Sequence, residues 1–185
     1  MKPEKCTLAI MIMALTVVSL LLTGCASPAT VQGMHPQSLA FQNKAPFSIS
    51  VQAAGGEKTN PLWTSEISNK SFAQTIRESI AESGLFRSVI TAGDGDYLLE
   101  VSVINVDKPV AGFDMTVNMA VSWKLTRVAT RKIVFQDVIY KSYTATMGDA
   151  FAGIKRLRLA QEGASRENIQ EGLARISRVK LQGNE

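Results

Sequence analysis

The chain has 185 residues, and its 20 basic and 16 acidic side chains leave a formal net charge of +4 at pH 7. This positive charge is mild and does not indicate a nucleic-acid function, which would need a dense basic stripe. Without the first 24 residues, which are considered separately below, 161 residues remain. That length suits one domain with a hydrophobic core better than two domains.

The first residues predict an export signal. Lys2 and Lys5 make the start positive, and an apolar stretch follows from residue 8 to residue 22. This stretch is shorter than the roughly 20 residues that a permanent membrane-spanning helix needs. A basic start, a short apolar run and small residues at the end are the parts of a cleaved signal.

The end of this signal, "LLTGC", resembles the bacterial lipobox, with Leu22, two small residues and Cys25. The resemblance implies that a diacylglycerol is attached to the Cys25 thiol. It also implies that a peptidase cuts between Gly24 and Cys25 and that the new amino group is acylated. The alternative is a plain transmembrane anchor with a chance cysteine. Two or more acyl chains hold a protein stably on a membrane, so the anchor is expected to be permanent.

The residues after Cys25 bear on localisation. In enterobacterial lipoproteins an aspartate in the second position retains the protein at the inner membrane, and here Ala26 and Ser27 follow the cysteine. We therefore expect the periplasmic face of the outer membrane. The only other cysteine, Cys6, leaves with the signal, so we expect no disulfide in the mature domain.

Residues 26–46 contain Pro28, Pro36, Pro46 and Gly33 and show no sustained period. This composition predicts a flexible tether. The sequence thus divides into a signal peptide (1–24), a lipidated flexible tether (25–46) and one periplasmic domain (47–185).

The first half of the domain shows a strand and a helix. Phe47, Ile49 and Val51 alternate with polar residues, which predicts a half-buried strand. After a loop, residues 69–83 carry apolar side chains at helical spacing, with Ser68 or Asn69 as the cap and Gly84 as the stop. A short strand is expected at residues 87–93, and the "GDGD" segment that overlaps its end predicts a turn.

Residues 97–106 predict a strand with apolar residues on both faces, as in a central strand covered on both sides. The clearest pattern is the alternation over residues 115–126. It predicts a long antiparallel strand, with inward residues Met115, Val117, Met119, Val121, Trp123 and Leu125. Residues 132–146 run back as a further strand.

The last third of the chain predicts a helix or two, which Gly163 would bend or divide. The expected order is β-α-β-β-β-β-α. We therefore predict an α+β fold, with a single antiparallel sheet of four to five strands and two helices packed on one face.

No catalytic constellation is apparent. The single histidine, His35, falls in the predicted tether, whereas a catalytic triad needs a rigidly held histidine. Too few histidines and cysteines remain for a metal site built on them. Asp94 and Asp96 lack the further ligands of a calcium loop, so a turn explains them better. We expect no catalytic residues, no metal and no cofactor, although chemistry using carboxylates alone stays open.

Two further features leave alternatives open. Leu62 and Trp63, in a loop, either cover the start of the following helix or form a contact for a partner. The basic residues near the C-terminus are either a solvated face or a contact for anionic lipid or lipopolysaccharide. They are Lys155, Arg156, Arg158, Arg166, Arg175 and Arg178.

The lipobox, the helix ending "SGLF", the strand "DYLLEVSVINV" and the long strand "MTVNMAVSWKLT" together resemble small envelope lipoproteins. These include the auxiliary lipoproteins of ABC-type transport systems and the lipopolysaccharide-assembly lipoprotein. The resemblance spans residues 47–179 and implies a non-enzymatic accessory role in moving lipid or envelope material. It implies an envelope protein partner from a transport system and no nucleic acid. The alternative is a stand-alone envelope-maintenance lipoprotein that binds lipid or cell wall.

Overall fold

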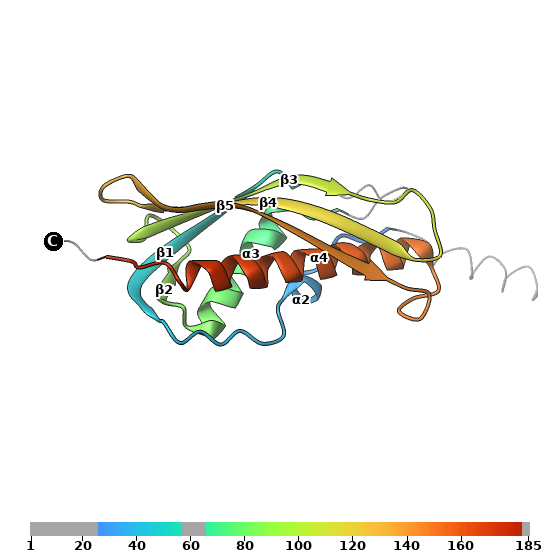
Figure 1. Cartoon of the computed structure of the whole chain (residues 1–185), viewed down its shortest axis with the longest axis horizontal. Helices are drawn as coiled ribbons and strands as arrows, with labels where there is room; N and C mark the ends of the chain where they lie inside the picture. The colour runs from blue at the N-terminus through green and yellow to red at the C-terminus, as the bar shows by residue number, and fades with distance from the viewer. Residues whose placement is uncertain (1–25, 57–65, 183–185) are drawn as a thin grey trace, which may run out of the picture.

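The computed structural model describes residues 26–56 and 66–182. Their elements follow the predicted order, with one short helix added at the start (Figure 1). In chain order they are α2 (Val31–Met34), β1 (Ala45–Ala54), α3 (Asn69–Ser83), β2 (Phe86–Ile90), β3 (Tyr97–Asp107), β4 (Met115–Arg127), β5 (Lys132–Ala145) and α4 (Gly153–Ile176).

The five strands form one sheet in the order β2-β1-β3-β4-β5. β1 is parallel to both of its neighbours, whereas β3, β4 and β5 pair antiparallel. The sheet is therefore mixed, and the prediction of a purely antiparallel sheet is wrong. The reason is that α3 returns the chain to the end where β1 began, and a strand that follows such a crossover runs parallel to the first.

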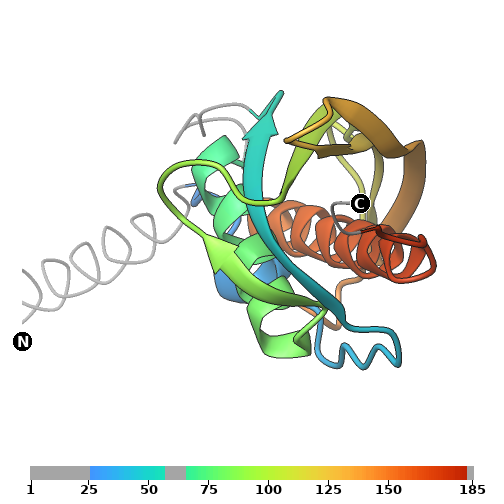
Figure 2. The same ribbon diagram turned by 90° about the vertical axis from the view of Figure 1, so that its left-hand side faces the viewer.

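β2 and β3 lie on opposite sides of β1 and are staggered along it. β2 ends opposite Ser50, and β3 begins opposite Ile49. The connection passes close to β1 at Gly95, where an added Cβ would lie 2.9 Å from the backbone of both residues. A glycine at this position therefore lets the chain cross from one side of β1 to the other (Figure 2).

The inner face of the sheet is covered by both long helices. α3 packs on β1 and β2, and α4 packs on β4 and β5, with the sheet curving over α4 (Figure 2). The inward face predicted for β4 is confirmed, since all six alternating side chains are at most 7% exposed. On β3, the four inward residues are also buried: Tyr97, Leu99, Val101 and Val103.

The ends of α3 follow the predicted chemistry. The Ser68 side chain accepts a hydrogen bond from the Ser71 amide, as an N-cap does. Gly84 ends the helix in the left-handed region, at φ 60°. The helix turns Phe72, Ile76 and Ile80 into the core, and each is at most 1% exposed.

α4 is one continuous helix, so Gly163 does not divide it. Instead, two glycines let aromatic rings lie against the helix backbone. An added Cβ would lie 2.2 Å from the Tyr143 ring at Gly163 and 2.6 Å from the Trp123 ring at Gly172. Close packing of α4 on the sheet therefore depends on these glycines. In the described part of the chain, no helix has the length and apolar character needed to cross a membrane.

The start of the described chain is packed on the domain. Ala29 and Met34 are at most 2% exposed, and α2 contacts both long helices. The Thr30 amide and hydroxyl donate to Glu162 at 2.8 and 2.9 Å, and Arg166 donates to the Gly33 carbonyl at 2.7 Å. Residues 26–36 therefore differ from the expected flexible tether, because buried apolar side chains and α4 groups hold them.

The outer face of the sheet carries no helix of the described chain (Figure 1). Ile104 on β3 is 57% exposed, and Tyr140 on β5 is 75% exposed. The expectation that β3 is covered on both sides is therefore wrong for the described residues. Alternation with the inward Val103 places Ile104 on the outer face, and the register shift between Val103 and Asn105 then returns Val106 to the inner side, where it packs against the core.

Candidate functional site

The residues predicted to carry function lie outside the described residues. Gly24 and Cys25 precede the first described residue, and Leu62 and Trp63 fall in the segment 57–65. Whether these residues lie close to one another is therefore outside what the structure describes. The structure does show which surfaces surround Ala26, the first described residue.

His35 is held at the end of α2. Its Nδ1 lies 2.9 Å from the Pro36 carbonyl oxygen, and its Nε2 lies 3.5 Å from a Glu82 carboxylate oxygen. No hydroxyl or thiol nucleophile takes part in these contacts. Among the described residues, no group of three or more histidine, cysteine, aspartate or glutamate side chains could hold a metal ion.

Asp96 has a structural partner in β1. Its carboxylate accepts from the Ser48 amide at 2.7 Å and the Ser48 hydroxyl at 2.8 Å. These hydrogen bonds, aided by the positive charge of Arg87, lower the pKa of Asp96. The "GDGD" segment is thus a connection between β2 and β3, as predicted, in which Asp96 fixes the start of β3 to β1.

Most of the basic residues on α4 have partners within the domain. Arg156 is 5% exposed, Arg158 donates to the Ser27 hydroxyl at 2.6 Å, and Arg166 holds Gly33. Arg175 binds Asp137 of β5. A freely solvated basic face and a continuous contact for anionic lipid are therefore both poor descriptions of α4.

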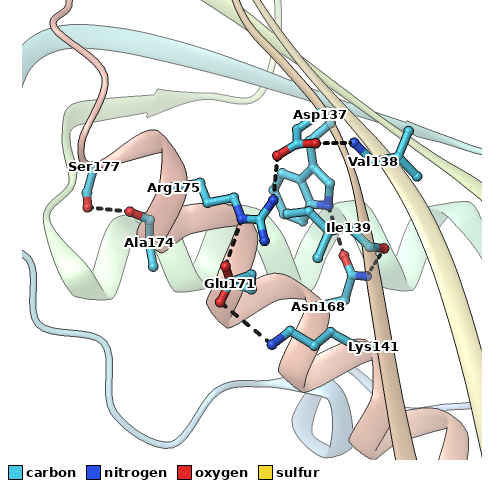
Figure 3. Close-up of polar contacts among 10 residues, drawn as sticks. Asp137, Val138, Ile139, Lys141, Asn168, Glu171, Ala174, Arg175 and Ser177 are labelled. Atoms are coloured by element: carbon cyan, nitrogen blue, oxygen red, sulfur yellow. Dashed lines mark hydrogen bonds and ion pairs between the residues drawn. The ribbon is translucent and has the colours of Figure 1, made fainter.

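A polar network joins α4 to the edge strand β5 (Figure 3). Arg175 lies 2.5 Å from Asp137 and 2.7 Å from Glu171, and Glu171 lies 3.6 Å from Lys141. Deeper in the same interface, Asn168 accepts from the Trp123 indole at 2.9 Å. Charged residues that point inward from an edge strand also protect it from pairing with another chain.

This network predicts a pH dependence. Hydrogen bonds from Arg175 lower the pKa values of Asp137 and Glu171 below their ordinary values of 3.8 and 4.5. A lowered pKa in the folded state gives stability that is present above the ordinary value and lost as the pH falls through the lowered one. We expect Arg175→Gln to reduce stability at pH 7, and the difference from the parent chain to shrink below about pH 4.

Urea unfolding at several pH values measures this difference. Arg178→Gln is the matched control, because it removes the same charge from an exposed site two residues after the helix ends. Its effect should not change between pH 7 and pH 3. If Arg175→Gln behaved like the control, the network would not contribute to stability.

One end of the molecule exposes apolar side chains on two loops. We call it the loop end and define it as residues 108–114, between β3 and β4, and residues 146–152, before α4. Phe113 is 82% exposed and Phe151 is 89% exposed. This feature could not be predicted from the sequence, because the two loops are far apart in the chain and neither has a periodic pattern.

The architecture is that of an α+β domain with a mixed five-stranded sheet and its helices on one face. Protein XCC0632 from Xanthomonas campestris, described with the family model DUF330, has a similar fold: the TM-score is 0.58 at 12% identity, over 82% of this chain and 93% of that one. The hypothetical protein CT253 from Chlamydia trachomatis gives a TM-score of 0.53 at 8% identity, over 72% of this chain and 96% of that one. At such low identity the likeness shows the fold alone. No family model and no curated protein matches the sequence.

Proposed function

We propose that the chain is a lipoprotein of the bacterial envelope, anchored through Cys25 to the periplasmic face of the outer membrane. In this proposal it is a non-enzymatic accessory subunit of a system that transports or assembles lipid or lipopolysaccharide. The observation that carries the proposal is the lipobox at residues 22–25, followed directly by a folded domain.

Two structural observations support this reading. The first is that the described chain is already packed on the domain at Ala29, four residues after Cys25. The second is that His35 contacts only a backbone carbonyl and Glu82 in the contacts described above, which is not the geometry of a triad. An accessory protein needs a held position on the membrane and a surface for a partner, and it needs no reactive group.

Cys25→Ala tests the anchor. Without the thiol no diacylglycerol can be attached, and the lipoprotein peptidase has no substrate. We expect a precursor that retains residues 1–24 and takes up no labelled palmitate, measured by gel mobility and metabolic labelling. Ser27→Ala, two residues further on, is the control and should mature normally. Normal maturation of Cys25→Ala would contradict the lipoprotein assignment.

A partner contact at Leu62 and Trp63 is the second part of the proposal, because tryptophan is favoured as an anchor at interfaces. We expect Trp63→Ala to reduce capture of an envelope protein from detergent-solubilised membranes while the melting temperature changes little. A buried tryptophan would instead lose roughly 3–5 kcal/mol of stability. A large drop in melting temperature would place Trp63 in the core and remove this contact from the proposal.

A further inference from the structure

The loop end carries four exposed apolar side chains. Val110, Phe113 and Phe151 are 103%, 82% and 89% exposed, and Met147 is 40% exposed. The remaining large exposed apolar residues of the described chain lie on strands β3 and β5: Ile104, Ile133 and Tyr140. A cluster of protruding aromatic and aliphatic side chains is unfavourable in water and indicates a contact surface.

The two loops are held together by one buried cation. Arg156, 5% exposed, donates to the carbonyls of Ala150 and Phe151 at 2.8 and 2.6 Å and to the Gly112 carbonyl at 3.2 Å. The second loop is also closed on itself, since Asp149 accepts from the Thr146 amide at 2.7 Å. The apolar side chains therefore project from a fixed frame, so they are presented outward rather than folded back onto the domain.

The described chain begins at the same end. Ser27 accepts a hydrogen bond from Arg158, in the first two turns of α4, and α4 starts directly after the second loop. Figure 1 shows this end at the right, with the β3–β4 connection and the start of α4 together. Ala26 is 8% exposed, and Cys25 is its direct neighbour in the chain. Adjacent Cα atoms are about 3.8 Å apart, so an acyl chain on Cys25 starts close to this part of the domain.

The charges at and beside the loop end are balanced. Lys108 is paired with Glu66 at 2.5 Å, and the exposed Lys155, in the first turn of α4, is offset by the exposed Asp149 and Asp114. An electrostatic attraction to anionic lipid headgroups would need a net positive surface. The apolar side chains are therefore the feature that selects the occupant of this surface.

We propose that the loop end lies in the lipid monolayer that holds the Cys25 anchor, with Val110, Phe113 and Phe151 inserted at the boundary between headgroups and acyl chains. This inference rests on the lipidation in the proposed function. It commits to lipid as the occupant, because the anchor would enter the membrane beside these side chains. Apolar side chains on peripheral proteins insert to a depth of about 5–10 Å at this boundary.

This contact would fix the orientation of the domain. The β4–β5 turn and the last described residues lie at the opposite end (Figure 1), where the Tyr97 hydroxyl donates to the Gln182 carbonyl. That end would point into the periplasm. A single flexible anchor would leave the domain free to tumble, whereas an anchor with inserted loops holds it in one pose.

The test uses the full mature lipoprotein in vesicles of phosphatidylethanolamine and phosphatidylglycerol. Val110→Cys is labelled with an environment-sensitive fluorophore, because this side chain makes little packing contact. Ile133→Cys, 49% exposed and at the start of β5 near the opposite end, is the matched control. In the mature lipoprotein Cys25 is alkylated and Cys6 has been removed, so only the introduced cysteine takes the label.

We expect the Val110 label to be quenched by nitroxide-labelled lipid and shielded from iodide, and the Ile133 label to behave in the opposite way. Raising the salt concentration should not change the result. The double variant Phe113→Ser and Phe151→Ser should lower the lipid quenching at Val110 while the protein still floats with the vesicles.

Three outcomes would contradict the inference. If the protein floats but the Val110 label is open to iodide, the loops do not insert although the anchor is present. Shielding from iodide without quenching by lipid would show that another protein surface, such as a second copy, covers the loops. If the protein did not float with the vesicles and Cys25 took up the fluorophore, Cys25 would carry no lipid. The anchor would then be contradicted, and so would the insertion of the loop end that rests on it.

Discussion

Val121→Asp is expected to destabilise the domain by several kcal/mol, whereas Ser122→Asp should cost much less and leave it folded. Val121 is fully buried at the centre of β4, opposite Val103 on β3 and Ile139 on β5. The residues paired with Val121 on both neighbouring strands are buried and apolar, and an uncompensated buried charge costs roughly 3–5 kcal/mol. The whole domain is expected to be stable by only about 5–15 kcal/mol.

The control uses the alternation of the strand. Ser122 is the next residue and is half-buried on the outer face, so its aspartate can reach water. Urea unfolding of the chain made without residues 1–24 measures both variants. Because Val121→Asp can fail to fold at all, Val121→Thr provides a milder change of similar shape, with an expected loss of about 1–3 kcal/mol. Equal stability of the Val121 and Ser122 variants would contradict the assignment of the inner face.

Asn168→Ala is expected to remove about 2–4 kcal/mol, because one side chain satisfies two buried groups. Its Oδ1 accepts from the Trp123 Nε1–H at 2.9 Å, and its Nδ2 donates to the Ile139 carbonyl at 2.8 Å (Figure 3). Asn168 and Trp123 are both fully buried, so water does not reach either group readily. Alanine leaves the indole donor and the carbonyl acceptor without these partners.

Gln74→Ala is the matched control, since it also removes an amide from a helix. The Gln74 amide donates to Glu78 at 2.9 Å on the exposed side of α3, where water can replace it. We expect a change within about 0.5 kcal/mol there. Thermal or urea unfolding compares the two variants, and a similar small effect at both positions would mean that the Asn168 contacts add little to stability.

The elements that could be predicted from the sequence are those that depend on residues close together in the chain. The six-residue alternation of β4 could be read without knowing its neighbours, because a strand with one buried face must alternate. Ser68 and Gly84 marked the ends of α3 for the same reason, since capping depends on residues within one turn. The segment that resembles a lipobox is local as well, because the enzymes of lipoprotein maturation act on a short linear segment, and its lipidation stays a prediction.

Features that depend on distant residues could not be predicted. Periodicity shows which face of β1 is buried but not which strand lies beside it, so the parallel pairing was missed. Gly163 looked like a helix breaker because the reason for a glycine there is not local. The Tyr143 ring packs against it, and Tyr143 lies 20 residues earlier in the chain. Residues 26–36 looked like a linker because their few buried side chains have no period, and their partners on α4 are more than 100 residues away.

The same limit applies to the candidate sites. A lipidation site at Cys25 could be proposed from its neighbours in the chain, but the loop end required the fold, since it unites two loops that Arg156 joins. For the basic residues of α4, the sequence suggested a surface that the fold does not provide. Their number suggested a charged surface, whereas in the structure Arg158, Arg166 and Arg175 bind groups of the same domain.

Mass spectrometry of the intact protein purified from membranes tests the central claim most directly. The account predicts a chain that begins at Cys25, with a diacylglycerol on its sulfur and an acyl group on its amino nitrogen. A chain that begins at Met1, or one that carries a free thiol at Cys25, would contradict the assignment as an envelope lipoprotein.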